Sequence, residues 1–273
     1  MSHRAPTVVS SVRPEHRPGL VTVARSGWTK IRSLRSTFWA LVVTAGLTIG
    51  LGMLSALGRT SGREPIAPDF NAAGFPLNGR YLSQLAIGVL GVLIITAEYS
   101  SGMIRTTFTA VPQRGSLLAV RAAVFGLVTF AVAAVTTFAT FFAAQPILNR
   151  DARHLGVSIT SPYALRIVVG AALYLTLCGL LGVALGALLR STPAAITALA
   201  GLLFMLPILL NFLPSTWHRD AIARWMPSNA GFQIIEKTTQ HLQFSPWAGL
   251  AVLAAWVAVI FTAALVLLRR RDV

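Results

Sequence analysis

Six stretches of the chain consist almost entirely of apolar residues, and polar segments separate them. An α-helix needs about 20 apolar residues to cross a hydrocarbon core of about 30 Å, so each stretch predicts a transmembrane helix. The sequence therefore predicts an all-α, polytopic membrane protein, with residues 20–271 forming a single transmembrane domain. The predicted spans are 38–57, 82–97, 117–144, 167–189, 194–213 and 248–268, of which the second is the shortest.

The first 36 residues differ from these apolar stretches. Residues 1–19 are polar and contain Pro and Arg, which predicts a disordered cytoplasmic tail and no cleavable signal peptide. Residues 20–36 place apolar side chains on one helical arc and polar side chains opposite. We interpret them as an interfacial helix and not as an extension of the first span, because inserting their basic residues would be costly. Its main interfacial residues are Trp28, Lys30, Ile31, Arg32, Leu34 and Arg35.

Composition agrees with a membrane protein. Hydrophobic residues make up 55% of the 273 positions and charged residues 11%, with a formal net charge of +15. The basic residues flank the apolar stretches, where they meet anionic lipid headgroups, so we do not expect nucleic-acid binding.

The basic residues also predict the orientation of the chain. With both termini on the cytoplasmic side of the plasma membrane, 14 of the 23 Lys and Arg residues lie inside. The positive-inside bias favours this multi-pass orientation. It places the loops 58–81, 145–166 and 214–247 outside.

Small residues recur at helical spacing in two of the predicted spans. Gly46 and Gly50 lie in the first span, and Gly179, Gly182 and Gly186 lie in the fourth. Such glycines let helix backbones approach closely, either within the chain or in a homodimer. We favour packing within the chain.

The residues for nucleotide chemistry are missing. A phosphate-binding loop needs a lysine after a glycine, but Lys30 and Lys237 follow Thr29 and Glu236. We predict no catalytic residue, cofactor or metal site in this chain, and we read its histidines as solvated residues. An ATP-driven role would therefore require a separate ATPase subunit.

The predicted spans also lack ionisable residues at their centres, which argues against ion-coupled transport and favours an amphipathic or apolar cargo. Polar residues within the spans could line a pathway or bond neighbouring helices. Helix packing is the commoner role for such side chains. The candidates are Gln84, Thr176, Thr197 and Asn211.

The segment between the second and third spans reads E-Y-S-S-G-M-I-R-T-T from Glu98 to Thr107. Glu98 follows the span directly, and Gly102 allows a sharp turn before a short helix. Such a helix could act as a lever on the membrane surface. An ordinary solvated loop is the alternative.

This segment resembles the cytoplasmic coupling helix of type-2 ATP-binding-cassette exporter permeases. The stretch W-T-K-I-R-S-L-R-S-T, residues 28–37, resembles the connecting helix of actinobacterial members, and M-P-S-N-A-G, residues 226–231, resembles their segment before the last span. The resemblance implies a second permease subunit and two ATPase subunits. It also implies that residues 221–243 contain short re-entrant or interfacial helices that close the pathway, for which a plain extracellular loop is the alternative. It also implies that a groove of the ATPase contacts Glu98, Tyr99, Gly102, Met103, Ile104, Arg105 and Thr106.

We therefore expect an exporter permease that moves an amphipathic substrate, with drug or antibiotic efflux, and hence antibiotic resistance, as the preferred role. The alternatives are an ATP-independent transporter or channel and a membrane-embedded enzyme or assembly factor. A Walker-motif ATPase encoded by a neighbouring gene would distinguish the first reading from the other two.

Overall fold

The computed structural model describes residues 35–61, 70–100, 114–150, 154–212, 214, 219–237 and 243–271. Within these ranges the secondary structure is helical, and six helical stretches are long and apolar enough to cross a membrane. The predicted all-α fold with six apolar helices is confirmed, and it is the architecture of a multi-pass membrane protein. The spans are Leu41–Thr60, Phe75–Ala97, Leu118–Arg150, Ala164–Leu189, Thr192–Leu210 and Pro246–Leu268.

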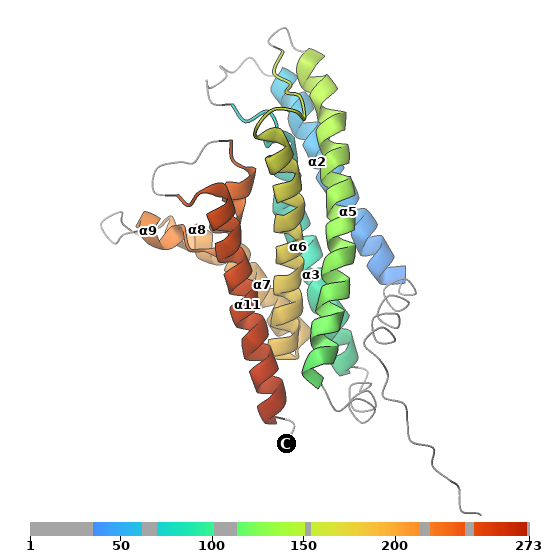
Figure 1. Cartoon of the computed structure of the whole chain (residues 1–273), viewed down its shortest axis with the longest axis vertical. Helices are drawn as coiled ribbons and strands as arrows, with labels where there is room; N and C mark the ends of the chain where they lie inside the picture. The colour runs from blue at the N-terminus through green and yellow to red at the C-terminus, as the bar shows by residue number, and fades with distance from the viewer. Residues whose placement is uncertain are drawn as a thin grey trace, which may run out of the picture.

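Five of the spans lie largely or wholly in one long α-helix, and Figure 1 shows these helices running along the long axis of the molecule. They are α2 (Arg35–Ser61), α3 (Arg80–Ser100), α5 (Arg114–Arg150), α6 (Ala164–Leu189) and α11 (Pro246–Arg271). The fifth span consists of α7 (Thr192–Ala200), a π-helical turn η2 (Gly201–Met205) and α8 (Leu206–Leu210).

The second span is longer than the sequence predicted. A 3₁₀ helix, η1 (Phe75–Gly79), leads directly into α3, so that the apolar stretch begins at Phe75 and spans 23 residues. Asn78 and Arg80 interrupt the apolar pattern, which is why the predicted span began at position 82. Both polar residues find partners within the protein, as described below.

Helix α6 lies at the centre of the bundle and packs against α3, α5 and α11. In an apolar stretch of 18 residues within α6, 78% of the residues are buried. The corresponding fraction is 17% in the fifth span and 17% in the sixth. A helix that is apolar on all sides is expected to occupy such a central position. Helix α6 ends at Leu189, and the next residue, Arg190, takes a left-handed conformation with φ 53° and makes a tight turn into α7.

Glycines bring α3 and α6 into backbone contact. A Cβ atom on Gly91 would collide with the carbonyl oxygen of Gly179, and a Cβ on Gly182 would collide with that of Gly88. The prediction of packing within the chain is therefore confirmed for the fourth span. It is wrong for Gly46 and Gly50, because a Cβ on either would meet no described atom within 4 Å.

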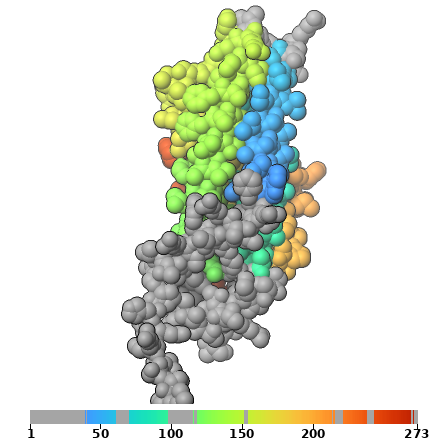
Figure 2. All heavy atoms as spheres, turned by 90° about the vertical axis from the view of Figure 1, so that its right-hand side faces the viewer, coloured from blue at the N-terminus to red at the C-terminus, as the bar shows by residue number. Residues whose placement is uncertain are grey.

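Helices α2 and α5 lie side by side on the face shown in Figure 2. A Cβ on Gly52 of α2 would collide with the methyl group of Thr140 in α5, so the two helices also pack closely. On its other side α2 meets α3, where the hydroxyls of Thr48 and Ser83 are 2.5 Å apart and both buried.

Short helices connect the fifth and sixth spans, where the family resemblance implied them. They are α9 (Arg219–Ala223), α10 (Pro227–Phe232) and the 3₁₀ helix η4 (Gln233–Ile235). This result contradicts the alternative of a plain extracellular loop. Their predicted role in closing a transport pathway stays a prediction.

Candidate functional site

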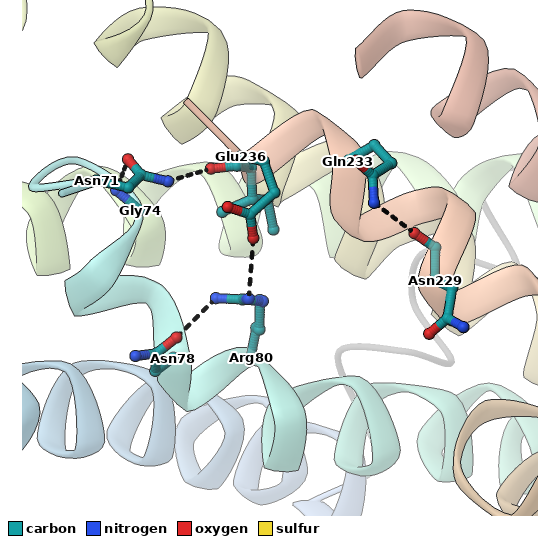
Figure 3. Close-up of polar contacts among 8 residues, drawn as sticks. Asn71, Gly74, Asn78, Arg80, Asn229, Gln233 and Glu236 are labelled. Atoms are coloured by element: carbon teal, nitrogen blue, oxygen red, sulfur yellow. Dashed lines mark hydrogen bonds and ion pairs between the residues drawn. The ribbon is translucent and has the colours of Figure 1, made fainter. Parts of the chain in front are cut away.

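Two segments far apart in the sequence meet near the end of the bundle where α3, α6 and α11 begin. One is the turn and 3₁₀ helix of residues 70–80, and the other is the segment 227–237 formed by α10, η4 and the residues after them (Figure 3). Polar side chains join the two segments to each other and to α6. We call this set of residues the polar clamp; its members are Asn71, Asn78, Arg80, Arg166 and Glu236.

Asn71 joins the two segments through both atoms of its side-chain amide. Its Nδ2 donates to the carbonyl oxygen of Ile235 at 2.8 Å, and its Oδ1 accepts the backbone N–H of Gly74 at 2.9 Å. A Cβ on Gly74 would lie 2.8 Å from the Ile235 carbonyl oxygen and would also collide with the Asn71 amide. Glycine is therefore required for this close approach.

Arg80 carries a buried charge, with 7% of its surface exposed. Its guanidinium lies 4.9 Å from the ring centre of Tyr81 and 4.8 Å from that of Phe232. Nη1 donates to Oδ1 of Asn78 at 2.9 Å, and Nη2 lies 3.9 Å from a carboxylate oxygen of Glu236. A buried charge is tolerated when such partners replace water. The two aromatic rings add cation–π attraction.

Arg166, in the first turn of α6, holds the far end of segment 227–237. Its Nη2 donates to the carbonyl oxygens of Glu236 at 2.8 Å and Lys237 at 3.3 Å, and its Nη1 donates to that of Ile234 at 3.4 Å. The ammonium of Lys237 in turn lies 5.5 Å from the ring centre of Tyr163. Together with Asn71, Arg166 binds the backbone carbonyls of all four residues from Ile234 to Lys237.

Gln84 and Tyr174 form a buried polar pair next to the clamp. The Tyr174 hydroxyl donates to Oε1 of Gln84, and both side chains are at most 1% exposed. The Tyr174 ring centre lies 5.0 Å from that of Phe232, which also contacts Arg80. Nε2 of Gln84 has no hydrogen-bond partner among the described residues. Gln84 therefore joins α3 to α6, which is the packing role expected of such a residue.

The other predicted intramembrane polar residues do not join this pair. Thr176 is buried and donates to the Ala172 carbonyl of its own helix, and exposed Thr197 donates to the Pro193 carbonyl of α7. Asn211 is exposed just after α8. Thr197 and Asn211 lie on opposite sides of the π-helical turn η2, 14 positions apart in the sequence. The described residues thus contain no single polar site formed by these candidates.

Most of the predicted ATPase contact and interfacial residues lie outside the described residues. For the contact segment these are Gly102, Met103, Ile104, Arg105 and Thr106, while Glu98 and Tyr99 belong to the last turn of α3. For the interfacial helix they are Trp28, Lys30, Ile31, Arg32 and Leu34. Arg35 is the first residue of α2, which continues into the first span.

The polar clamp was missed by sequence reasoning, which counted Arg80, Arg166 and Lys237 as outward-facing charges. One local signal was available, because Asn followed three residues later by Gly, as in Asn71 and Gly74, is typical of a turn closed by the Asn side chain. The partner segment could not be found in this way. It lies about 160 positions further along the chain, as the separation of 164 between Asn71 and Ile235 shows.

The clamp is suited to holding backbone segments in place, since its polar groups bond mainly to backbone carbonyls and to one another. Among the described residues, no three His, Cys, Asp or Glu side chains lie close enough together to hold a metal ion. No protein-family model matches the chain, and no curated protein is significantly similar to it.

Proposed function

We propose that this chain is the permease subunit of an ATP-binding-cassette exporter in the cytoplasmic membrane. A separate ATPase subunit drives it, a second permease subunit completes the pathway, and an amphipathic substrate such as a drug or antibiotic is moved outward. The observation that carries the proposal is the coupling motif of residues 98–107, placed between two spans of a six-span bundle.

The arrangement of the helices supports a receiving role for this motif. Helix α3 ends at Ser100 and α5 begins at Arg114, and both of these ends lie at the end of the bundle where α11 finishes (Figure 1). Helix α3 is also in backbone contact with the central helix α6 through Gly88 and Gly182. A force applied between α3 and α5 would therefore reach the middle of the bundle through closely packed helices.

The positions of charged residues along the spans support a transporter that is driven by a separate ATPase. Arg121 and Arg166 lie near the beginnings of the third and fourth spans, and Arg80 lies near the beginning of the second. The central parts of the described spans hold no Asp, Glu, Lys, Arg or His. Ion-driven transporters depend on such groups at mid-membrane.

The first experiment is co-purification of the full chain from its native membrane, followed by identification of bound proteins and transport assays with the recovered pair. We expect a Walker-motif ATPase. The detergent-purified chain alone should hydrolyse no ATP, because neither lysine can complete a phosphate loop. ATP hydrolysis by the pure chain, or transport that continues without any ATPase, contradicts the proposal.

Substitutions in the motif test its coupling role. The double variant Glu98→Lys/Arg105→Glu keeps the net charge and should leave membrane insertion intact while separating ATP hydrolysis from transport. Gly102→Pro should do the same, because proline removes an N–H and excludes positive φ. The matched control Glu98→Asp/Arg105→Lys should transport like the wild type. Wild-type transport by the reversed and proline variants would assign residues 98–107 to a solvated loop.

A further inference from the structure

The fifth span is interrupted near its middle. Between α7 and α8, residues Gly201–Met205 form a π-helical turn in which the N–H of Leu206 bonds to the carbonyl of Gly201. Pro207 lies two residues after the π-turn and has no N–H, so a carbonyl of the preceding turn loses its partner within the helix. A π-turn next to a proline is a recognised cause of helix bending.

The half of the span before the interruption is anchored to the bundle. The Thr192 hydroxyl donates to that of Thr96 in α3 at 2.8 Å. Ala195 and Leu199 are fully buried, and Leu199 fills the space beside Gly88, where an added Cβ would lie 2.6 Å from one of its methyl groups. Leu203, within the π-turn, is the last buried residue of this span.

The half after the interruption has no such anchor among the described residues. Helix α8 contains no buried residue, and its exposed side chains continue beyond its end to Phe212, which is 82% exposed. Figure 1 shows α8 and α9 extending to one side of the bundle, away from α2 and α5. The change from anchored to unanchored helix therefore coincides with the π-turn and Pro207.

We propose that the π-turn Gly201–Met205 and Pro207 form a hinge on which the outer half of the fifth span moves relative to the rest of the bundle. Three features lower the cost of bending there. The missing N–H of Pro207 weakens the hydrogen-bond ladder of the helix, and Gly201 adds backbone freedom. The space beside Gly201 is also open, because a Cβ there would meet no described atom within 4 Å, so bending at this residue breaks no close contact on that side. The movement is a property of this chain, so it stands apart from the identity of any ATPase or cargo.

Distances between spin labels in lipid nanodiscs test the hinge in the full chain with Cys178 replaced by Ala. The outer pair places labels at Phe212 and at Leu165, which is exposed in the anchored first turn of α6. The inner control pair places them at Thr197, on the anchored half, and at Leu93, which is exposed on α3. We expect the outer distance distribution to be at least about twofold broader than the inner one.

Replacing single prolines by alanine then tests whether the flexibility of the fifth span arises at Pro207. Pro207→Ala restores the N–H and should narrow the outer distribution to about half its width while leaving the inner one unchanged. Pro146→Ala removes a proline that lies inside α5 and should change neither. If the Pro207→Ala chain does not insert into the membrane, Gly201→Ala is the alternative variant, because there is room for its methyl group. It should also narrow the outer distance distribution. Equal widths for the two pairs, or an outer width that does not respond to Pro207→Ala or Gly201→Ala, overturns the hinge.

Discussion

The carbonyl oxygen of Gly88 in α3 occupies the place where Gly182 of α6 would carry a Cβ atom. The two helices therefore cross with their backbones in contact, and Gly91 repeats this contact against Gly179 one turn further along. In a lipid environment such close packing supplies van der Waals contact that the hydrophobic effect cannot provide. The crossing fixes α3, and with it the clamp residue Arg80, against the central helix.

We predict that Gly182→Val destabilises the protein by roughly 1–3 kcal/mol, because its side chain would force the α3 and α6 backbones apart. The measurement is the thermal unfolding midpoint of the purified chain in detergent. Gly50→Val is the matched control, since a Cβ at Gly50 meets no described atom within 4 Å. A similar loss of stability in both variants would show that valine in any span is harmful and that the crossing is not specifically responsible.

Arg80 provides a second prediction. Replacing it by Ala should cost about 2 kcal/mol, because the hydrogen bond to Asn78 and the contacts with the rings of Tyr81 and Phe232 are lost together. Glu236→Gln should cost less than about 1 kcal/mol, because its side chain is 35% exposed and the ion pair is long at 3.9 Å. Unfolding by detergent titration measures both. A larger effect for Glu236→Gln would make the ion pair the main contact.

The number and order of the spans could be predicted because each long apolar stretch in this sequence forms a membrane-length helix. Boundaries failed where polar residues belong to a span, as with Asn78 and Arg80 at the start of the second one. The π-turn was not predicted either. Pro207 signals an irregular helix, but the backbone geometry around it depends on where Leu199 and Leu203 are anchored.

The polar clamp shows a different limit of sequence reasoning. Arg166 could be identified as a charge at the end of a span, which made it an indicator of orientation. Its guanidinium donates hydrogen bonds to the backbone carbonyls of Ile234, Glu236 and Lys237. Every residue has a backbone carbonyl, so the sequence does not indicate which ones an arginine will bind. Gln84 could be predicted as a helix-packing residue because an intramembrane amide must find a partner, although its partner Tyr174 could not be named.

The Gln84 and Tyr174 pair allows a double-mutant cycle. Gln84→Leu and Tyr174→Phe each remove one partner of the buried hydrogen bond, and the double variant removes both. We expect a coupling energy of roughly 0.6 kcal/mol and at most about 1.7 kcal/mol, as in double-mutant cycles on hydrogen bonds between membrane helices. Reversible unfolding in detergent gives the four free energies. Strictly additive effects would mean that Gln84 contributes through packing alone.

The orientation of the bundle can be tested with single cysteines in a Cys178→Ala chain. Thr160, exposed in the loop before α6, should react on intact cells with a maleimide that does not cross membranes. Ser191, exposed in the turn after α6, should react only after the cells are opened. The basis is the excess of basic residues on the side of the termini. Labelling of Ser191 and protection of Thr160 on intact cells would invert the predicted topology.

Arg166 allows a direct test of what the clamp holds. Its guanidinium binds three of the four carbonyls from Ile234 to Lys237, and the remaining one, that of Ile235, is bound by Asn71. Arg166→Ala should therefore free this stretch and raise the rate of amide hydrogen exchange in peptides covering residues 230–237 by at least about tenfold. This increase corresponds to a loss of about 1.4 kcal/mol in the free energy of local opening.

Exchange in α6 beyond its first turn should not change, because Ile167 and Val168 stay buried in the core. Arg150→Ala is the control, as Arg150 is exposed at the end of α5 and the segment 227–237 should keep its protection in that variant. Unchanged exchange in Arg166→Ala would mean that Asn71 and the buried side chains of Ile234 and Ile235 are sufficient to hold the segment.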